Sequence, residues 1–455
     1  MAGANRLTLP SPQLTGVIVS FVVLFLMGGS SRADVQSLAF LNPALILCCG
    51  GALLKLKREQ LQDKKWFFVC LLLIFLLLAF YAAPWPISVG EASLAEGSLQ
   101  PAWEAADASR LCTLTGAPAT VWQSLVFLSA PLAVFLFALQ MDRDDLTLTV
   151  LFITGMATIS GILGVLQLAG NPNGPLYFYR ITNYGSAVGL FANRNHAAVL
   201  LACIFPMLAL IASKSPVIGR GTKNVSKWMA IAVAILLVPL ILVTGSRSGL
   251  LAAVIGLIGG TMLYSSGVRT HQERKSGTSL VPLIATTATI GLVFTTIYFS
   301  RAEAIDRIFV ETNGNDRADF WTSSLQMFWQ YFPFGFGPGG FVPAFLIDEP
   351  TDLLGSAYLN RLHNDWLETA LTFGVPGILL MLAGIIYYIH RLFVLWVRMS
   401  GERSAVALGR MASIVIAILA IASLSDYPLR TPAMAGFAAL VLVWFAHARY
   451  EPNPC

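Results

Sequence analysis

The sequence predicts an all-α protein that crosses a membrane about twelve times. Of its 455 residues, 56% are hydrophobic and only 12% are charged, about half the charged share of an ordinary soluble domain. The apolar residues gather in runs of about 20, the length that a helix needs to span the hydrocarbon core. Basic residues concentrate in alternate connections between these runs. A chain this apolar has too few charges to cover its surface in water, so a soluble protein is excluded.

The expected spans follow one another along the whole chain, with edges good to a few residues. The first has one basic residue, Arg6, ahead of it, and Ser31-Arg32-Ala33 after it is a poor cleavage site. We therefore expect an uncleaved span rather than a signal peptide. The twelve runs are residues 14–29, 37–54, 66–83, 122–141, 146–169, 193–213, 228–244, 249–266, 279–299, 366–389, 406–425 and 433–448.

The basic residues orient these spans. With both termini in the cytoplasm, the inner segments hold 19 of the 29 basic residues, including all eight lysines, and 8 of the 24 acidic residues. The outer segments hold 10 basic and 16 acidic residues, as the positive-inside rule requires. The basic balance thus reflects cytoplasmic loops beside anionic lipid and does not predict binding to nucleic acid.

Two outer loops are long. Residues 84–121 are acidic and contain two tryptophans, and we expect either a small cap over the helices or a partly ordered linker. Residues 300–365, between the ninth and tenth spans, are too long for a mere connector. Within them, 317–331 predict an amphipathic helix, and 333–341 form a glycine-rich turn. No strand precedes this turn and no Lys-Ser/Thr follows it, so it is not a nucleotide-binding loop.

All ten outward basic residues are arginines, and several lie at the mouths of spans, among them Arg194, Arg247 and Arg430. Ionisable groups at membrane depth are functional candidates. A planar guanidinium suits a bidentate grip on phosphate oxygens better than lysine does. The alternative is that each arginine pairs with a nearby carboxylate or reaches the lipid headgroups.

Two histidines face the same outer side. His363, in the segment Arg361-Leu362-His363-Asn364-Asp365, lies at the outer N-terminus of the tenth span. Imidazole titrates in the range a general base needs, and the positive end of a helix keeps it neutral. The alternative is a structural His363 that caps the helix. His196 is a competing base at the start of the sixth span, although its asparagine neighbours equally suit a helix cap.

Five motifs in a fixed order give the sequence a family resemblance. They are FANRNHAA (191–198), VTGSRSGLLA (243–252), RADFW with PFGFGPGGF (317–341), HNDWLETALTFGVPG (363–377) and SDYPLRTPA (425–433). With them the chain resembles the O-antigen ligase and O-antigen polymerase superfamily of bacterial inner-membrane glycosyltransferases. The resemblance covers roughly residues 150–435.

The resemblance implies a metal-independent, inverting glycosyltransferase without a cofactor, acting at the periplasmic face of the bacterial inner membrane. The donor would be a glycan on undecaprenyl diphosphate, and the acceptor a lipid A-core sugar or another lipid-linked glycan. Carried over by motif, Arg247 and Arg317 look like the diphosphate-binding residues and His363 like the catalytic histidine. Family members carry paired histidines at this point, whereas this chain has Leu362 before His363. Further candidates for substrate binding are Arg194, His196, Arg361 and Arg430.

We divide the chain into N-terminal spans with the first outer loop (1–145), a catalytic region (146–435) and a last span with its cytoplasmic tail (436–455). The shared motifs do not decide between ligase and polymerase, which differ in the acceptor. A transporter or flippase for the same lipid-linked substrate is the alternative, yet no half-to-half repeat of the kind such folds show is evident. A non-catalytic assembly partner would explain the loops but not the cluster of arginines and histidines.

Overall fold

The computed structural model is helical, as predicted, and the two strands among its described residues are two residues long. It describes residues 10–63, 65–86, 111–112, 114–115, 118–213, 223–268, 316–349, 360–399 and 404–447. The helices are α1 (Pro12–Met27), α2 (Leu38–Lys55), α3 (Arg58–Asp63), α4 (Lys65–Ala82), α7 (Pro118–Phe127), α8 (Ser129–Leu139), α9 (Arg143–Ala169), α10 (Arg194–Ser213), α11 (Lys223–Leu242), α12 (Arg247–Val268), α15 (Asp316–Gln330), α16 (Phe341–Asp348), α17 (Asp365–Phe393), η4 (Val394–Arg398), α18 (Ser404–Ala422), η5 (Pro428–Arg430) and α19 (Pro432–His447).

The chain is a multi-pass membrane protein. Among the described residues, seven helices are long and apolar enough to cross a membrane, and four shorter helices are apolar as well. Each of these coincides with one of the runs expected from the sequence. The ninth expected run, 279–299, lies outside the described residues, so the count of twelve spans stays a prediction.

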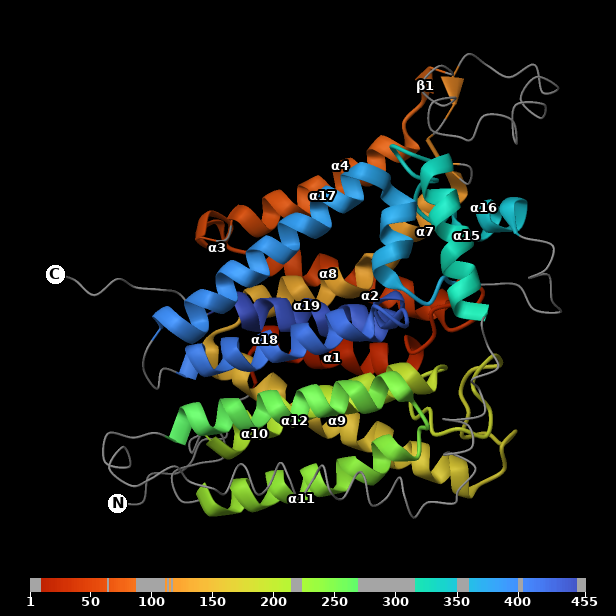
Figure 1. Cartoon of the computed structure of the whole chain (residues 1–455). Coiled ribbons are helices and arrows are strands. Elements are labelled where there is room, and N and C mark those ends of the chain that lie inside the picture. Colours follow the sequence, from red (N-terminus) through yellow and green to blue (C-terminus); the bar gives the residue numbers. More distant parts are fainter. Residues whose placement is uncertain are drawn as a thin grey trace.

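The helices α10, α12 and α18, which lead to or from the candidate residues, pack side by side, and their contacts give their relative directions (Figure 1). Glycines of α12 contact α10 at successive levels: Gly249 against Ala198 and Gly260 against Phe205. These pairs advance together along both helices, so α10 and α12 run parallel and begin at the same end of the bundle. Gly259 of α12 contacts Ile414 of α18, and Gly256 contacts Ile418 further along α18. Helix α18 therefore runs the opposite way and finishes at that end.

The tenth expected span, α17, is broken at Gly374, whose φ of 53° and ψ of −138° are not helical. Pro376 adds to the break because it has no N–H to donate to the carbonyl of Thr372. A kink frees backbone carbonyls, and inside a membrane each of them needs another donor. Glycine and proline this close together in a span are enough to indicate such a break from the sequence alone.

The glycine-rich turn supplies those donors. The amide of Phe336 donates to the carbonyl of Leu371 at 3.2 Å, and the amide of Gly337 to that of Thr372 at 2.9 Å. The hydroxyl of Tyr81 on α4 donates to the carbonyl of Phe373 at 2.9 Å and to that of Phe334 at 2.6 Å. The turn is therefore docked on the break in α17.

The amphipathic helix expected at 317–331 forms as α15. Met327 belongs to a buried cluster on which Trp321 and Phe328 pack, whereas Leu325 and Trp329 are 53% and 71% exposed. The Trp321 indole donates to the Leu362 carbonyl at 3.2 Å. This bond joins α15 to the segment that contains His363.

Only the ends of the expected cap, 84–121, are described. Strand β1 (Trp85–Pro86) pairs antiparallel with β2 (Leu111–Cys112), and residues 87–110 lie outside the described residues. The buried Thr115 packs closely on Gly337: a Cβ added to Gly337 would lie 2.4 Å from the Cβ of Thr115. The close of the first outer loop thus packs on the glycine-rich turn.

We expect Gly374→Ala to destabilise the protein strongly. A Cβ at this position would lie 2.0 Å from the Pro333 carbonyl oxygen, and φ is positive, so the cost is expected to be about 3 kcal/mol or more. The midpoint of thermal unfolding of the detergent-purified protein measures it. Gly384→Ala is the matched control, because Gly384 lies in the same helix and a methyl added there would have no atom within 4 Å. Equal midpoints for the two variants would contradict the docked break.

Candidate functional site

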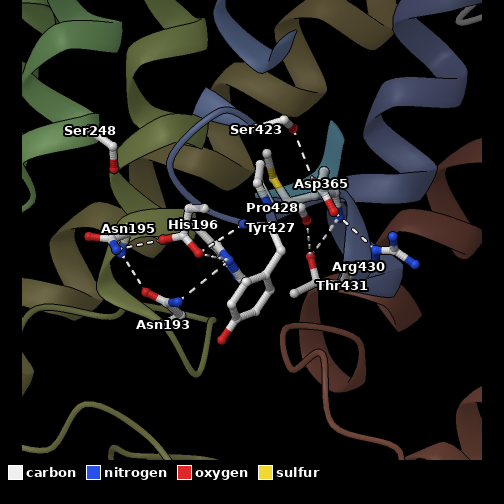
Figure 2. A network of polar contacts seen from close by, with 12 residues as sticks. Asn193, Asn195, His196, Ser248, Asp365, Ser423, Tyr427, Pro428, Arg430 and Thr431 are labelled. Atoms are coloured by element: carbon white, nitrogen blue, oxygen red, sulfur yellow. Dashed lines mark hydrogen bonds and ion pairs between the residues drawn. The ribbon is translucent and has the colours of Figure 1, made fainter. Parts of the chain in front are cut away.

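His196, His363, Arg361 and Arg430 meet at the end of the bundle where α10, α12 and α17 begin and α18 finishes. The amide of Asp365, the first residue of α17, donates to the Ser423 carbonyl at 2.9 Å. The turn between α18 and α19, residues 423–431, lies between these starts and reaches His196 of α10. Figure 2 shows Asn193, Asn195 and His196 on one side of the Tyr427 ring and Asp365 and Arg430 on the other.

His363 has a backbone conformation that few residues adopt. Its φ is 56°, and it is the one non-glycine residue with positive φ in the part of the chain that the structure describes. The next residue, Asn364, caps α17 by accepting from the Leu367 amide at 3.0 Å. A left-handed non-glycine residue carries strain, and such strain clusters at active sites. The chain thus holds a half-buried imidazole at a helix start at an energetic cost.

Tyr427 lies between two imidazoles that are distant in the sequence. Its ring centre is 4.9 Å from that of His363 and 5.2 Å from that of His196, edge-on in both cases. Burial raises the pKa of Tyr427 to about 12, so its hydroxyl stays protonated at neutral pH. The two predicted histidines are therefore brought together through one aromatic ring.

A buried carboxylate, Asp426, supports this cluster. Its Oδ1 lies 3.6 Å from Nε2 of His196 and accepts from the Tyr427 amide at 2.8 Å. The Asn195 side chain donates to Oδ2. Burial raises the pKa of Asp426, but the hydrogen bond and charge of His196, then the charge of His363, outweigh it and lower the pKa to about 2. Asp426 is thus an anion that faces both histidines.

Arg361 and Arg430 make a second cluster with two carboxylates of α17. The Arg430 Nε donates to Asp365 at 3.0 Å, and the Arg361 Nη1 donates to the buried Glu368 at 2.9 Å. Glu368 also accepts from the Leu362 amide at 3.1 Å, next to His363. These bonds hold the His363 segment on α17, a structural role that matches the ion-pairing alternative raised for the arginines.

Substrate binding by these two arginines stays a prediction. Their side chains are 23% and 25% exposed, and the Arg361 Nε is without a hydrogen-bond partner among the described residues. Arg430 pairs with Asp365 and Glu368, although its neighbour Asp426 is the carboxylate closest in sequence. Both side chains therefore remain partly exposed.

The two arginines at the starts of α10 and α12 lie near each other. A Cβ added to Gly245 would lie 3.7 Å from Nη1 of Arg194. Gly245, whose φ is 63°, is two residues before Arg247. Arg247 is exposed as the first residue of α12. Arg317 is the second residue of α15, one turn before Trp321, but its side chain lies outside the described residues.

Sequence reasoning did not identify Asp426 and Glu368 as supports of the site. The signal for Asp426 was its place in the motif SDYPLR, and for Glu368 its place one turn into α17, where an apolar run contains few acids. Asp365, two residues after His363, is placed by sequence either to orient His363 or to favour the positive helix start. Its side chain contacts Arg430 and Ser423, so its link to His363 is through the backbone.

Acid should destabilise the protein partly through Asp426. Its pKa in the folded chain, about 2, is below the ordinary value of 3.8, so the stabilisation from its ionised form is complete above about pH 4 and is lost as the pH falls toward 2. We expect the thermal midpoint of the wild type to fall more steeply over this interval than that of Asp426→Asn. Parallel curves for the two proteins would show that Asp426 is not stabilised as an anion.

Comparison with known protein families bears on the identity of this chain. Residues 231–382 match the family model described as O-antigen ligase. The matched part includes α12 with Arg247, α15 with Arg317, the glycine-rich turn and the start of α17 with His363. A search of curated proteins found no match. The match supports the O-antigen ligase and polymerase superfamily that the motifs indicated.

Proposed function

We propose that this chain, whose residues 231–382 match the O-antigen ligase family, transfers a glycan from undecaprenyl diphosphate to an acceptor sugar at the periplasmic face of the bacterial inner membrane. The observation that carries the proposal is the strained His363, held against Tyr427 and facing Asp426, at the end of the bundle where Arg194 and Arg247 begin their helices. A base and a set of cations at one end are what this reaction requires.

His363 is the proposed general base. It takes the proton of the acceptor hydroxyl while that oxygen attacks the anomeric carbon of the donor sugar. The bond from the anomeric carbon to the phosphate oxygen breaks, and undecaprenyl diphosphate leaves with the electron pair. Attack opposite to the leaving group inverts the configuration. Asp426 favours the imidazolium that forms, because a buried anion stabilises a neighbouring cation.

The arginines are the proposed stabilisers of the leaving group. Charge grows on the diphosphate as the bond breaks, and guanidinium groups can neutralise it without a metal. Arg247 and Arg194 lie at the N-termini of α12 and α10, and Arg317 in the first turn of α15. Helix N-termini favour phosphate through their free amides and dipole. Arg361 and Arg430 are proposed to contact the sugars or the phosphates from the α17 side.

The periplasmic location rests on the charges. The starts of α10, α12 and α17 carry arginine alone among basic residues, while the lysines fall on the other side of the expected membrane. Donor and acceptor are proposed to reach the site from the membrane, as lipid A-core or as a second lipid-linked glycan.

The test is a transfer assay with purified protein, a defined undecaprenyl-diphosphate-linked oligosaccharide and either lipid A-core or a second lipid-linked oligosaccharide. A new glycosidic bond without ATP or added metal is expected, and the productive acceptor separates ligase from polymerase. Proteoliposomes with donor on one side form the second arm. Movement of the donor across the bilayer without any new glycosidic bond would overturn the proposal and favour a flippase.

A further inference from the structure

The connection between α9 and α10, residues 170–193, is long and forms neither helix nor strand, yet all of it is described. Loops of this length in folded proteins usually serve a function. Its last residue, Asn193, contacts His196 of the catalytic cluster, and residues 170–192 have no part in that cluster as described above.

Buried groups fix the backbone of this loop. Gln167, 1% exposed, donates to the carbonyls of Leu176 at 2.9 Å and Gly189 at 2.8 Å and accepts from the Gly189 amide. The buried Tyr177 hydroxyl donates to the Ser186 carbonyl at 3.1 Å, and the buried Tyr179 hydroxyl accepts from the Gly29 amide at 2.7 Å. The loop is therefore a built scaffold.

The same scaffold leaves aromatic and polar side chains on its surface. Phe178 and Tyr184 are 53% and 44% exposed, and Arg180 and Asn183 are exposed beside them. The Tyr184 ring packs on Tyr177 at 5.3 Å, and its hydroxyl donates to the Arg180 carbonyl at 2.9 Å. These bonds hold the Tyr184 ring in one place on the surface.

The loop is joined directly to the candidate site. The Asn183 side chain accepts from the Arg194 amide at 3.0 Å, which places the loop surface at the start of α10. The Ala192 amide donates to the Gly29 carbonyl at 3.0 Å, and Ser31, two residues on, hydrogen-bonds Tyr427. Figure 1 shows the loop, in yellow, at the end of the bundle where α10 and α12 begin.

We propose that residues 176–184 form a glycan-binding surface that holds sugar rings of the substrate beyond the reacting bond. The proposal rests on the proposed transfer function and adds a substrate subsite to it. Fixed aromatic rings offer a flat apolar face to the C–H face of a pyranose, and amide and guanidinium groups match its hydroxyls. The sugar rings belong either to the donor or to the acceptor, since both carry the same chemistry.

A bilayer interface is the competing occupant, because aromatic residues also gather at headgroup level. Contact with lipid requires only apolar surface area, whereas stacking on a sugar requires an aromatic ring. Phe178→Leu keeps the first and loses the second, and Phe178→Trp keeps both. These two variants therefore separate the occupants, and Tyr184→Leu tests the second ring.

The experiment measures KM for donor and for acceptor separately in the transfer assay. We expect Phe178→Leu and Tyr184→Leu to raise KM for one of the two about tenfold, which corresponds to about 1.4 kcal/mol, with kcat and the thermal midpoint little changed. Phe178→Trp should keep the wild-type KM. The substrate whose KM changes identifies the source of the sugar. The control is Trp228→Leu. Trp228 is exposed near the N-terminus of α11, at the opposite end of the bundle from the loop.

A second readout does not depend on catalysis. The free oligosaccharide, released from the donor lipid or from the acceptor by mild acid, is used in saturation-transfer NMR with the purified protein. Signals that are present with wild type and absent with Phe178→Leu support the surface even if no transfer occurs and the proposed function has failed. Wild-type KM values and signals in Phe178→Leu would overturn the inference and leave lipid contact as the role of this loop.

Discussion

Replacement of His363 is expected to abolish glycan transfer, with kcat reduced by about 10³-fold or more, because a positioned general base contributes about 10²–10⁴. His363→Ala removes the base, and KM for both substrates should change much less than kcat. The measurement is the initial rate of product formation at saturating donor and acceptor. The pH–rate profile should also lose its acidic limb, which in the wild type reports protonation of the base.

The backbone at His363 provides the matched control. Its φ of 56° suits glycine and asparagine better than alanine, so His363→Asn and His363→Gly keep the loop without the base. We expect both to fold with the wild-type thermal midpoint and to remain inactive, and added imidazole to restore part of the rate of His363→Gly. Substantial activity in His363→Asn would show that the residue serves only to shape the start of α17 and that the base lies elsewhere.

The second partner of Tyr427 gives that alternative a definite candidate. His196 is 1% exposed, and its Nδ1 has no hydrogen-bond partner among the described residues. If activity survives at His363 and is lost in His196→Asn, the roles of the two histidines are reversed.

The membrane helices could be predicted because a single local property specifies them. Hydropathy marks a span wherever it occurs, and α9, α10 and α18 lie at the positions expected from it. The break in α17 was also local, since Gly374 and Pro376 interrupt a helix in any context. The glycine-rich turn was predicted, but the segment on which it docks was not. Only the fold brings Gly337 to the carbonyl of Thr372.

The sequence predicted which charged and titratable residues belong to the site, but not which of them contact one another. His363 and His196 stood out as outer histidines, but the ring between them, Tyr427, comes from a third part of the chain. Asp426 pairs with His196 across more than two hundred residues. Sequence spacing carries no information on such pairs, because helix packing alone brings them together.

The arginine at the start of α12 is expected to have the next largest effect. Arg247→Ala should lower kcat with donor by about 10²–10³-fold, the cost of removing one donor to a developing anion. Arg247→Lys keeps the charge and loses the planar fork, so it should retain an intermediate rate. Arg317→Ala should behave in the same way, and the effect of the double variant should fall short of the product of the two, because both act on one diphosphate.

A matched control for Arg247 lies at the opposite end of the bundle. Arg143 is likewise the exposed first residue of a spanning helix, α9, and α9 runs antiparallel to α10, since Thr154 contacts Met207 while Gly161 contacts Leu201. Arg143→Ala should therefore leave kcat unchanged while removing the same charge. An equal loss in both variants would mean that the net charge at a helix start matters to insertion or stability. Loss of activity in Arg247→Ala alone, together with weaker inhibition of that variant by pyrophosphate, would place the leaving diphosphate at the starts of α10 and α12. The reason is that the charge would then be needed where the diphosphate departs and not where a helix enters the membrane.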